Sequence, residues 1–280
     1  GRKGIFEKLQ KVIPAGEKII WFHCASLGEF EQGRPVMERL RTVTTEHKIL
    51  LTFFSPSGYE AQKDYKGADW VFYLPMDSAR NARRFLGIVH PSLVIFVKYE
   101  FWYYYLKKIK YRNIPLILIS ALFRKDMPFF KWYGGLQRKI LSRFEHLFVQ
   151  NESSKKLLDE IGWADITTVS GDTRFDRVIE IAGAAEPVPG IEKFIDGHKT
   201  IIAGSTWSDD EELLKKASGF LESNGVKLII APHHVNPKHI RTLQALFPGS
   251  LLYSTISRGS NDNSRILIID NVGMLSRIYQ

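Results

Sequence analysis

The sequence lacks the features that are typical of disulfide-rich proteins, of membrane-spanning proteins and of proteins with the common nucleotide-binding motifs. Cys24 is its single cysteine, which excludes an intramolecular disulfide and suits a reducing compartment. No apolar run reaches the roughly 18 residues of a membrane span, and no charged-then-apolar signal peptide is present. Neither G-x-G-x-x-G nor a Walker P-loop occurs, so dinucleotide redox chemistry and P-loop hydrolysis lose their usual support.

The composition is that of a folded, basic protein. Apolar residues make up 44%, aromatic residues 12% and charged residues 25%, which excludes disorder and low complexity. The 280 residues are nearly twice the roughly 150 of one domain, so they predict about two. The formal net charge of +9 favours an anionic partner such as nucleic acid, nucleotide, phosphate or anionic lipid.

Short apolar, β-branched runs alternate with helical patterns along residues 1–182. The runs predict buried strands at residues 18–24, 48–54, 70–73, 92–97, 115–120, 146–149 and 166–170. The patterns between them predict helices at residues 30–41, 78–87, 101–110, 130–142 and 152–161. This alternation predicts an α/β fold with a doubly wound parallel sheet.

A second domain of the same kind is predicted after a linker at residues 183–198, where small residues, proline and glycine cluster. Strands at residues 199–203, 226–231 and 265–269, with helices at 208–223 and 237–246, predict the first part of this domain at residues 199–280. Because the chain opens on Gly1 and ends on an uncapped helical pattern, we expect a fragment, with any membrane anchor upstream. Two such domains in series predict a ligand cleft at the carboxyl ends of both sheets.

The segment after the first predicted strand is the strongest candidate for catalysis. Ser26, Gly28 and Glu29 form a turn and open the next helix. Gly28 lets a ligand approach the backbone, and the helix start offers N–H groups to an anion. Glu29 would accept a proton from an attacking hydroxyl as a general base. The S-x-x-E spacing also predicts an ordinary capping box, which the spacing alone favours.

A second acidic candidate follows the strand predicted at residues 92–97. Glu100 comes at the same edge of the sheet as Glu29, and Lys98 would neutralise a phosphate there. The alternative for Glu100 is an ordinary acid at a helix start, paired with the neighbouring lysine.

The second predicted domain offers a phosphate-binding turn. Gly204, Ser205 and Thr206 lie between a strand and a helix, where glycine, hydroxyls and a helix N-terminus suit a phosphate. Pro232 and His233 follow the next strand at the equivalent edge, where a nucleotide base or phosphate would lie. The histidines of this half lack a carboxylate or cysteine at ligand spacing, so no metal site is expected.

Three segments of the first domain combine basic with apolar or aromatic side chains. They are the amphipathic start at residues 2–13, residues 101–112 and residues 129–139. In any one such segment, the aromatic side chains more often belong to the core and the basic ones to a solvated face. Together they suit an acceptor with acyl chains and phosphates, and an anionic membrane surface.

Six motifs in order resemble those of one family. They are His23-x-x-Ser26-x-Gly28-Glu29, Leu74-Pro75-Met76-Asp77, Glu100-Phe101-Trp102, Gly171-Asp172-Thr173-Arg174-Phe175-Asp176, Gly204-Ser205-Thr206-Trp207 and Asp270-x-x-Gly273-Met274-Leu275. Over nearly the whole chain they resemble the 3-deoxy-D-manno-octulosonic acid (Kdo) transferases, which add Kdo to the lipid A precursor. The resemblance implies a GT-B glycosyltransferase with an N-terminal acceptor domain and a C-terminal donor domain, both Rossmann-like, the second continuing beyond Gln280.

The resemblance also implies a reaction and a place. It is an inverting, metal-independent transfer of Kdo from CMP-Kdo to a hydroxyl of a lipid A precursor, in lipopolysaccharide biosynthesis of a Gram-negative bacterium. No cofactor and no nucleic-acid partner are implied. The protein would sit at the cytoplasmic face of the inner membrane, peripheral or N-terminally anchored.

Residue roles follow from the same resemblance. Glu29 matches the catalytic base. Lys98 stands where the family usually has a glutamate linked to transition-state stabilisation, and Arg174 stands where it has a lysine for the leaving phosphate. The acceptor-side residues are Ser26, Gly28 and Glu100. The CMP-binding residues are Gly204, Ser205, Thr206, Pro232, His233, Val272, Gly273 and Met274, with His233 replacing an arginine and Met274 a glutamate.

Two other functions stay open. Another metal-independent GT-B transferase would use a different nucleotide sugar, which a donor panel distinguishes. A basic nucleic-acid or lipid-binding module would lack catalysis. Against that module, the basic residues form no known recognition motif, and binding alone gives no reason for Glu29 in the cleft.

Overall fold

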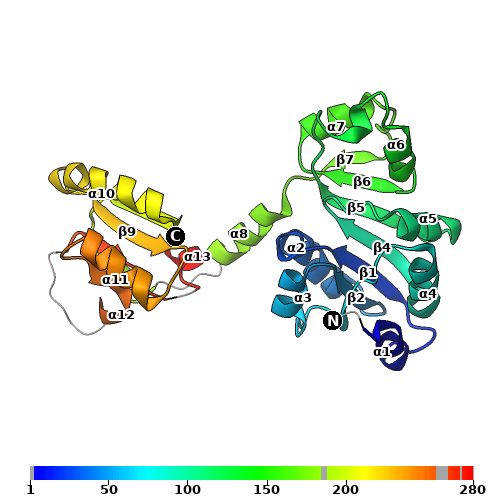
Figure 1. The fold of residues 1–280 in the computed structure, drawn as a ribbon, viewed down its shortest axis with the longest axis horizontal. Helices are drawn as coiled ribbons and strands as arrows, with labels where there is room; N and C mark the ends of the chain where they lie inside the picture. The colour runs from blue at the N-terminus through cyan, green and yellow to red at the C-terminus, as the bar shows by residue number, and fades with distance from the viewer. Residues whose placement is uncertain (1–2, 184–187, 257–263, 272, 280) are drawn as a thin grey trace. The chain divides into compact units, whose positions relative to one another are not determined.

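The computed structural model describes residues 3–183, 188–256, 264–271 and 273–279 (Figure 1). The chain divides into two units, Gly1–Arg177 and Val178–Gln280, which are described separately. The helix α8 (Thr173–Gly183) runs across this division. All strands predicted above are present, and both sheets are parallel.

The sheet of the first unit has seven strands in the order β3-β2-β1-β4-β5-β6-β7. They are β1 (Ile19–Cys24), β2 (Lys48–Phe53), β3 (Trp70–Tyr73), β4 (Pro91–Val97), β5 (Leu116–Ala121), β6 (His146–Val149) and β7 (Thr167–Val169). The chain builds outward from β1 in one direction and from β4 in the other. The pair β1 and β4 is therefore the switch point, where the loops leaving the two strands diverge and an α/β sheet binds its ligand.

Helices cover both faces of this sheet (Figure 1). They are α1 (Ile5–Val12), α2 (Leu27–Val43), α3 (Pro56–Gln62), α4 (Ala79–Val89), α5 (Tyr103–Tyr111), α6 (Gly135–Leu141) and α7 (Glu152–Asp159). Side chains alternate along β1: Trp21 packs with α4 and α5, and Phe22 packs with α2. The strand is buried on both faces, which explains its continuous apolar run.

The second unit contains a sheet in the order β10-β11-β9-β8. Its strands are β8 (Thr200–Thr206), β9 (Lys227–Pro232), β10 (Leu251–Leu252) and β11 (Ile266–Ile268). Its helices are α9 (Ile191–Ile195), α10 (Ser208–Ser223), α11 (Pro237–Leu246), α12 (Tyr253–Ile256) and α13 (Leu275–Ile278). One core packs with α10 and α11 and a second with α9 and α13, so this sheet too is covered on both faces.

The helix predicted at residues 130–142 is shorter than expected. A 3-10 turn at Pro128–Phe130 comes first, and α6 begins only at Gly135. A Cβ added at Gly134 would collide with the carbonyl of Pro128, so the chain turns there in a space that only glycine fits.

The amphipathic start of the chain forms α1, but its apolar face is buried in the protein. Ile5, Leu9 and Ile13 join the first core, and α1 packs on α4. These side chains are not available to a membrane, which corrects the interpretation of this face as a lipid-binding one. Arg2, at the start of the stretch, lies outside the described residues.

The segment predicted as a linker, residues 183–198, contains a helix. In α9, Ile191 and Phe194 are buried in the core of the second unit together with Val188. The described part of this segment thus packs with the second unit. Residues 184–187 lie outside the described residues.

Candidate active site

The loops that leave β1 and β4 carry the candidate catalytic residues of the first unit. Glu29 lies in the first turn of α2, directly after β1, and Glu100 follows β4. The two strands are neighbours at the switch point of the sheet. The sheet order therefore brings together two acids that are 71 residues apart in the sequence.

Glu29 and Ser26 form a complete capping box. Glu29 N donates to Ser26 Oγ at 3.4 Å, and Ser26 N donates to Glu29 Oε2 at 3.2 Å. Burial and the nearby Glu100 carboxylate raise the pKa of Glu29 to about 7, against the backbone N–H groups of Ala25 and Ser26 and the Lys98 charge, which lower it. The cap predicted from the spacing is thus present, on a carboxyl group that exchanges a proton near neutral pH.

Glu100 lies in a buried network with His23. Its Oε2 is 3.1 Å from His23 Nε2 and also accepts from Trp102 Nε1. His23 Nδ1 lies 2.9 Å from Thr52 Oγ1 and 3.1 Å from Thr52 O. In the described part of the chain Glu100 pairs with His23 and not with Lys98, so it is not the helix-start acid of the alternative reading.

His23 is a residue of the site that the sequence patterns indicated only as part of a motif, although its position carries a signal. It is a polar residue inside an otherwise apolar buried strand, and Thr52 occupies a similar position in β2. Residue 23 pairs with residue 52 in the parallel register. A fully buried polar side chain needs a partner, and each strand supplies one for the other.

Backbone strain marks the carboxyl edge of both sheets. Lys98 after β4, Ser120 in β5 and Ser205 in β8 have left-handed φ values of 68°, 52° and 56°. Such a conformation costs a non-glycine residue about 1–3 kcal/mol and is concentrated at functional sites. Of these three, Lys98 and Ser205 are predicted site residues. His90, Asn113 and Asp196 also have left-handed φ values and lie elsewhere.

Arg174 is bound by Asp172. Its Nε donates to Asp172 Oδ1 and Oδ2 at 3.0 and 2.9 Å, and its Nη2 donates to Oδ2 at 2.5 Å. These bonds lower the pKa of Asp172, with a smaller contribution from Lys98. The cation predicted to meet a leaving phosphate is therefore already paired, and a phosphate would have to displace the carboxylate.

In the second unit Gly204, Ser205 and Thr206, predicted as a turn, are the last residues of β8, and residues of α10 and α11 hold this end of the strand. Thr206 Oγ1 donates to Glu211 Oε1 at 3.0 Å, and His239 Nε2 lies 2.9 Å from the same oxygen. Glu211 is buried, whereas Ser205 is exposed. The Thr206 hydroxyl therefore holds the end of β8, and the exposed Ser205 hydroxyl is the one open to a ligand.

The predicted donor residues of β8 and β9 lie together. Thr206 pairs with Pro232 in the sheet register, and His233 N donates to Thr206 O at 2.9 Å. The His233 ring stacks on Trp207 with centroids 4.4 Å apart and planes at 22°. An aromatic surface thus lies beside the residues predicted to bind phosphate, and nucleotide bases stack on surfaces of this kind.

For the remaining predicted donor residues the structure shows packing and backbone conformation. A Cβ at Gly204 would collide with Tyr279 and Leu275, so packing beside α13 requires this glycine. The Met274 side chain is buried in the core of the second unit. Gly273 has a left-handed φ of 87°. Val272 lies outside the described residues.

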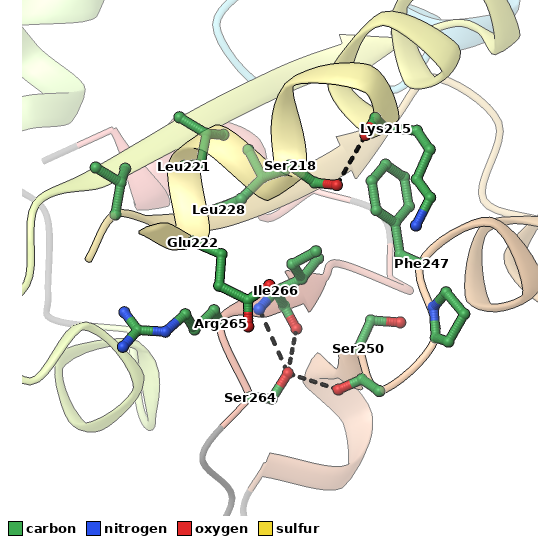
Figure 2. Close-up of a pocket in the computed structure, with 13 residues that line it drawn as sticks. Lys215, Ser218, Leu221, Glu222, Leu228, Phe247, Ser250, Ser264, Arg265 and Ile266 are labelled. Atoms are coloured by element: carbon green, nitrogen blue, oxygen red, sulfur yellow. Dashed lines mark hydrogen bonds between the residues drawn. The ribbon is translucent and has the colours of Figure 1, made fainter. Parts of the chain in front are cut away.

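A cavity of about 270 Å³ in the second unit lies elsewhere (Figure 2). Its walls include Lys215 and Glu222 of α10, Phe247, and Ser264 and Arg265 before β11. It lies where β9 and β11 begin, whereas the donor residues lie where strands end. None of the predicted donor residues lines it.

Within residues 3–183, 188–256, 264–271 and 273–279, no three His, Cys, Asp or Glu side chains are placed to hold a metal ion. No helix in the same ranges is long and apolar enough to cross a membrane.

Solved structures show which fold this is. UDP-GlcNAc 2-epimerase from Neisseria meningitidis, bound to UDP-GlcNAc, matches with a TM-score of 0.60 and 18% identity over 94% of this chain and 74% of that one. MurG of Acinetobacter baumannii matches with a TM-score of 0.54 and 10% identity over 93% and 68%. At these identities the likeness concerns the fold alone, which is of the GT-B type.

Sequence relatives are more specific. The 3-deoxy-D-manno-octulosonic acid transferase of Aquifex aeolicus is 27% identical over 98% of this chain and 71% of its own length. The Haemophilus influenzae enzyme of the same name is 25% identical over 93% and 62%. A bifunctional glycosyltransferase/methyltransferase of Fusobacterium nucleatum is 24% identical over 94% and 42%, so the chain spans less than half of that protein. The profile of the 3-deoxy-D-manno-octulosonic-acid transferase (kdotransferase) family matches residues 2–177, more than half of the chain, and the chain belongs to that family.

Proposed function

We propose that the protein transfers Kdo from CMP-Kdo to a hydroxyl of a lipid A precursor in lipopolysaccharide biosynthesis, with inversion and with Glu29 as general base. The observation that carries the base assignment is the position of Glu29. It lies at the switch point of the acceptor-side sheet, with its pKa raised to about 7 by burial and by Glu100. The rest of the proposal is supported by family membership.

In the proposed reaction, a bond forms between the acceptor oxygen and the anomeric carbon of Kdo. The bond from that carbon to the CMP phosphate oxygen breaks, and its electrons leave with CMP. The acceptor proton passes to Glu29. A base with a pKa near the operating pH is ionised often enough to accept this proton and basic enough to drive the transfer.

The leaving phosphate gains negative charge that a cation must balance. In the proposal Arg174 does this by exchanging Asp172 for the phosphate, and Lys98 supports it, since its charge already interacts with both Asp172 and Glu29. Fixed cations and helix N-termini would supply the charge stabilisation that other transferases take from Mg²⁺. Metal independence is part of the proposal.

An open cavity on the first unit supports an anionic acceptor and membrane surface. It measures about 780 Å³, and its charged lining residues are Arg80, Arg83, Arg84, Lys108 and Arg112, with no carboxylate. Of these, Arg84 is paired with Glu7 at 3.0 Å. Clustered cations of this kind attract the phosphates of lipids.

Exposed aromatic side chains support the same partner. Trp132 is 92% exposed, next to Tyr133, and Leu136 follows in α6. Lys131 and Lys139 belong to the same segment. Tryptophan and tyrosine with basic neighbours suit the interface of a membrane. We place the protein peripherally at the cytoplasmic face of the inner membrane, with this surface and the cationic cavity in contact with lipid.

The experiment is Glu29→Gln in the full-length protein, assayed for transfer from CMP-Kdo to a lipid A precursor. Glutamine keeps an oxygen for the Ser26 N–H and cannot take the acceptor proton, so transfer is expected to stop while folding and lipid binding persist. Near-normal turnover would remove Glu29 from the base role. A donor panel in which CMP-Kdo fails and a UDP-sugar works would overturn the donor assignment.

A further inference from the structure

His23 is a fully buried histidine whose two ring nitrogens both have close polar partners. Nδ1 faces Thr52, and Nε2 faces Glu100 at 3.1 Å. The ring is enclosed by aromatic side chains, with Phe96 at 5.2 Å and Trp102 at 5.4 Å between centroids. In such a dry site each hydrogen must be assigned to a donor.

The hydrogen bonds of Thr52 fix the first ring proton. Thr52 Oγ1 donates to Phe22 O at 3.2 Å and accepts from Trp21 Nε1 at 2.8 Å, so its one hydrogen is used. Thr52 O is only an acceptor. His23 Nδ1, which lies beside both oxygens, must therefore carry a hydrogen.

The contact with Glu100 requires a second proton. A bare Nε2 facing a carboxylate would place lone pairs against each other at 3.1 Å in a buried site. Glu100 Oε2 accepts from Trp102 Nε1 at the same time, so an N–H at His23 Nε2 would be the second N–H donor to this oxygen. We infer that His23 is a doubly protonated positioning residue that pairs with Glu100 and so offsets part of the negative charge that Glu100 places beside Glu29.

This inference rests on the proposed function, because it concerns how readily the proposed base loses its proton. In the described chain, the ionisable groups that interact with Glu29 are Glu100 and Lys98 after β4 and the buried Cys24 thiol on β1. The Glu100 carboxylate raises the pKa of Glu29, and the Lys98 ammonium lowers it. Without a cation at residue 23, Glu100 would raise the pKa of Glu29 further.

The proton assignment has a direct test that needs no turnover. The full-length protein is labelled with ¹⁵N-histidine, and the ring nitrogens of His23 are identified by their loss in His23→Gln. Both nitrogens are expected to be protonated at pH 7, and Nε2 to lose its proton in Glu100→Gln. An unprotonated Nε2 in the wild-type protein at pH 7 would overturn the assignment.

The effect on the base is tested by pH–rate profiles. His23→Gln keeps an N–H donor for Glu100 and removes the positive charge at residue 23. The acidic limb of the kcat/KM profile, which reports the pKa of Glu29, is therefore expected to move up by about 1 pH unit. Glu100→Gln is expected to move it down. His146→Gln, on the exposed end of the sheet beside Thr168, is the matched control and should leave the limb in place.

The outcomes separate the two proposals. If both His23→Gln and Glu100→Gln lower the rate but leave the acidic limb of the pH–rate profile in place, His23 acts only through packing and the inference is overturned. Absence of Kdo transfer by the wild-type protein would overturn the proposed function, and the NMR result would still decide the proton assignment.

Discussion

Glu29 and Ser26 hold each other through two reciprocal hydrogen bonds, from Ser26 N to Glu29 Oε2 at 3.2 Å and from Glu29 N to Ser26 Oγ at 3.4 Å. The capping box fixes the start of α2 and at the same time aims the carboxyl group at the switch point. A structural cap and a proposed base are thus one residue, so variants must separate the two roles.

The variant Ser26→Ala tests the role of the capping box in stability apart from the role of Glu29 as a base. It removes the hydroxyl acceptor at the N-cap and leaves the Glu29 carboxyl in place, so the free energy of unfolding should fall by about 1 kcal/mol. Urea denaturation measures this loss. Transfer should fall far less than in Glu29→Gln, and equal losses of activity would show that the cap itself is what catalysis needs.

The raised pKa of Glu29 makes stability depend on pH. Its folded value of about 7 exceeds its ordinary 4.5, so the native state binds more protons than the unfolded state between these values. The contribution of Glu29 to the free energy of unfolding is therefore greatest at low pH and is lost as pH rises through 7. Comparing the pH dependence of unfolding in wild type and Glu29→Gln measures it, since the variant lacks this slope; identical slopes would contradict the raised pKa.

Arg174 is expected to act through its charge and its fork geometry. Arg174→Ala should lower kcat/KM for CMP-Kdo at least about tenfold, and Arg174→Lys should fall between it and wild type, because lysine keeps the charge and loses bidentate contact. Steady-state kinetics with varied donor measure the effect. If Arg174→Ala has the kinetics of the wild type, Arg174 does not stabilise the leaving phosphate, and other cations must do so.

Gly134 and Gly135 form a matched pair for the turn before α6. Gly134→Ala places a Cβ against the Pro128 carbonyl, whereas Gly135→Ala meets nothing within 4 Å. We expect Gly134→Ala to lose about 1–3 kcal/mol of unfolding free energy and Gly135→Ala to be neutral or stabilising. Thermal unfolding of the two variants checks this, and equal stability would contradict the tight turn.

Membrane binding should need anionic lipid and weaken with salt, because the cationic cavity supplies the attraction. Arg80→Glu with Arg83→Glu should reduce binding to anionic liposomes, and Trp132→Ser should reduce the part that survives high salt. Liposome flotation measures both. Binding that is equal on neutral liposomes would argue against the electrostatic part.

Local patterns were enough for every strand except β10 and for the helices α2, α4, α5, α7, α10 and α11. The apolar runs at β1 and β4 are buried on both faces, so their continuous hydrophobicity identified them without knowledge of their neighbours. The turn at Gly134 was missed, because glycine is required there by a carbonyl six residues earlier that the helical pattern does not reveal. The helix α3 was also missed, although Ser55 and Pro56 carry an N-cap and N1 signal.

In the candidate site, too, local contacts could be predicted from the sequence and contacts between distant segments could not. The sequence determined the Ser26–Glu29 cap, because a capping box depends on residues three positions apart, and the order of the acidic and predicted phosphate-binding segments along the chain. The Arg174–Asp172 pair joins residues two positions apart, and the sequence patterns did not single it out although it is local. Only the tertiary structure decided that Glu100 pairs with His23, a residue on a neighbouring strand. The same holds for α1, whose apolar face packs on α4 instead of facing lipid. Pairing across a sheet depends on strand order and register, and burial depends on which surfaces meet, and neither is written in local spacing.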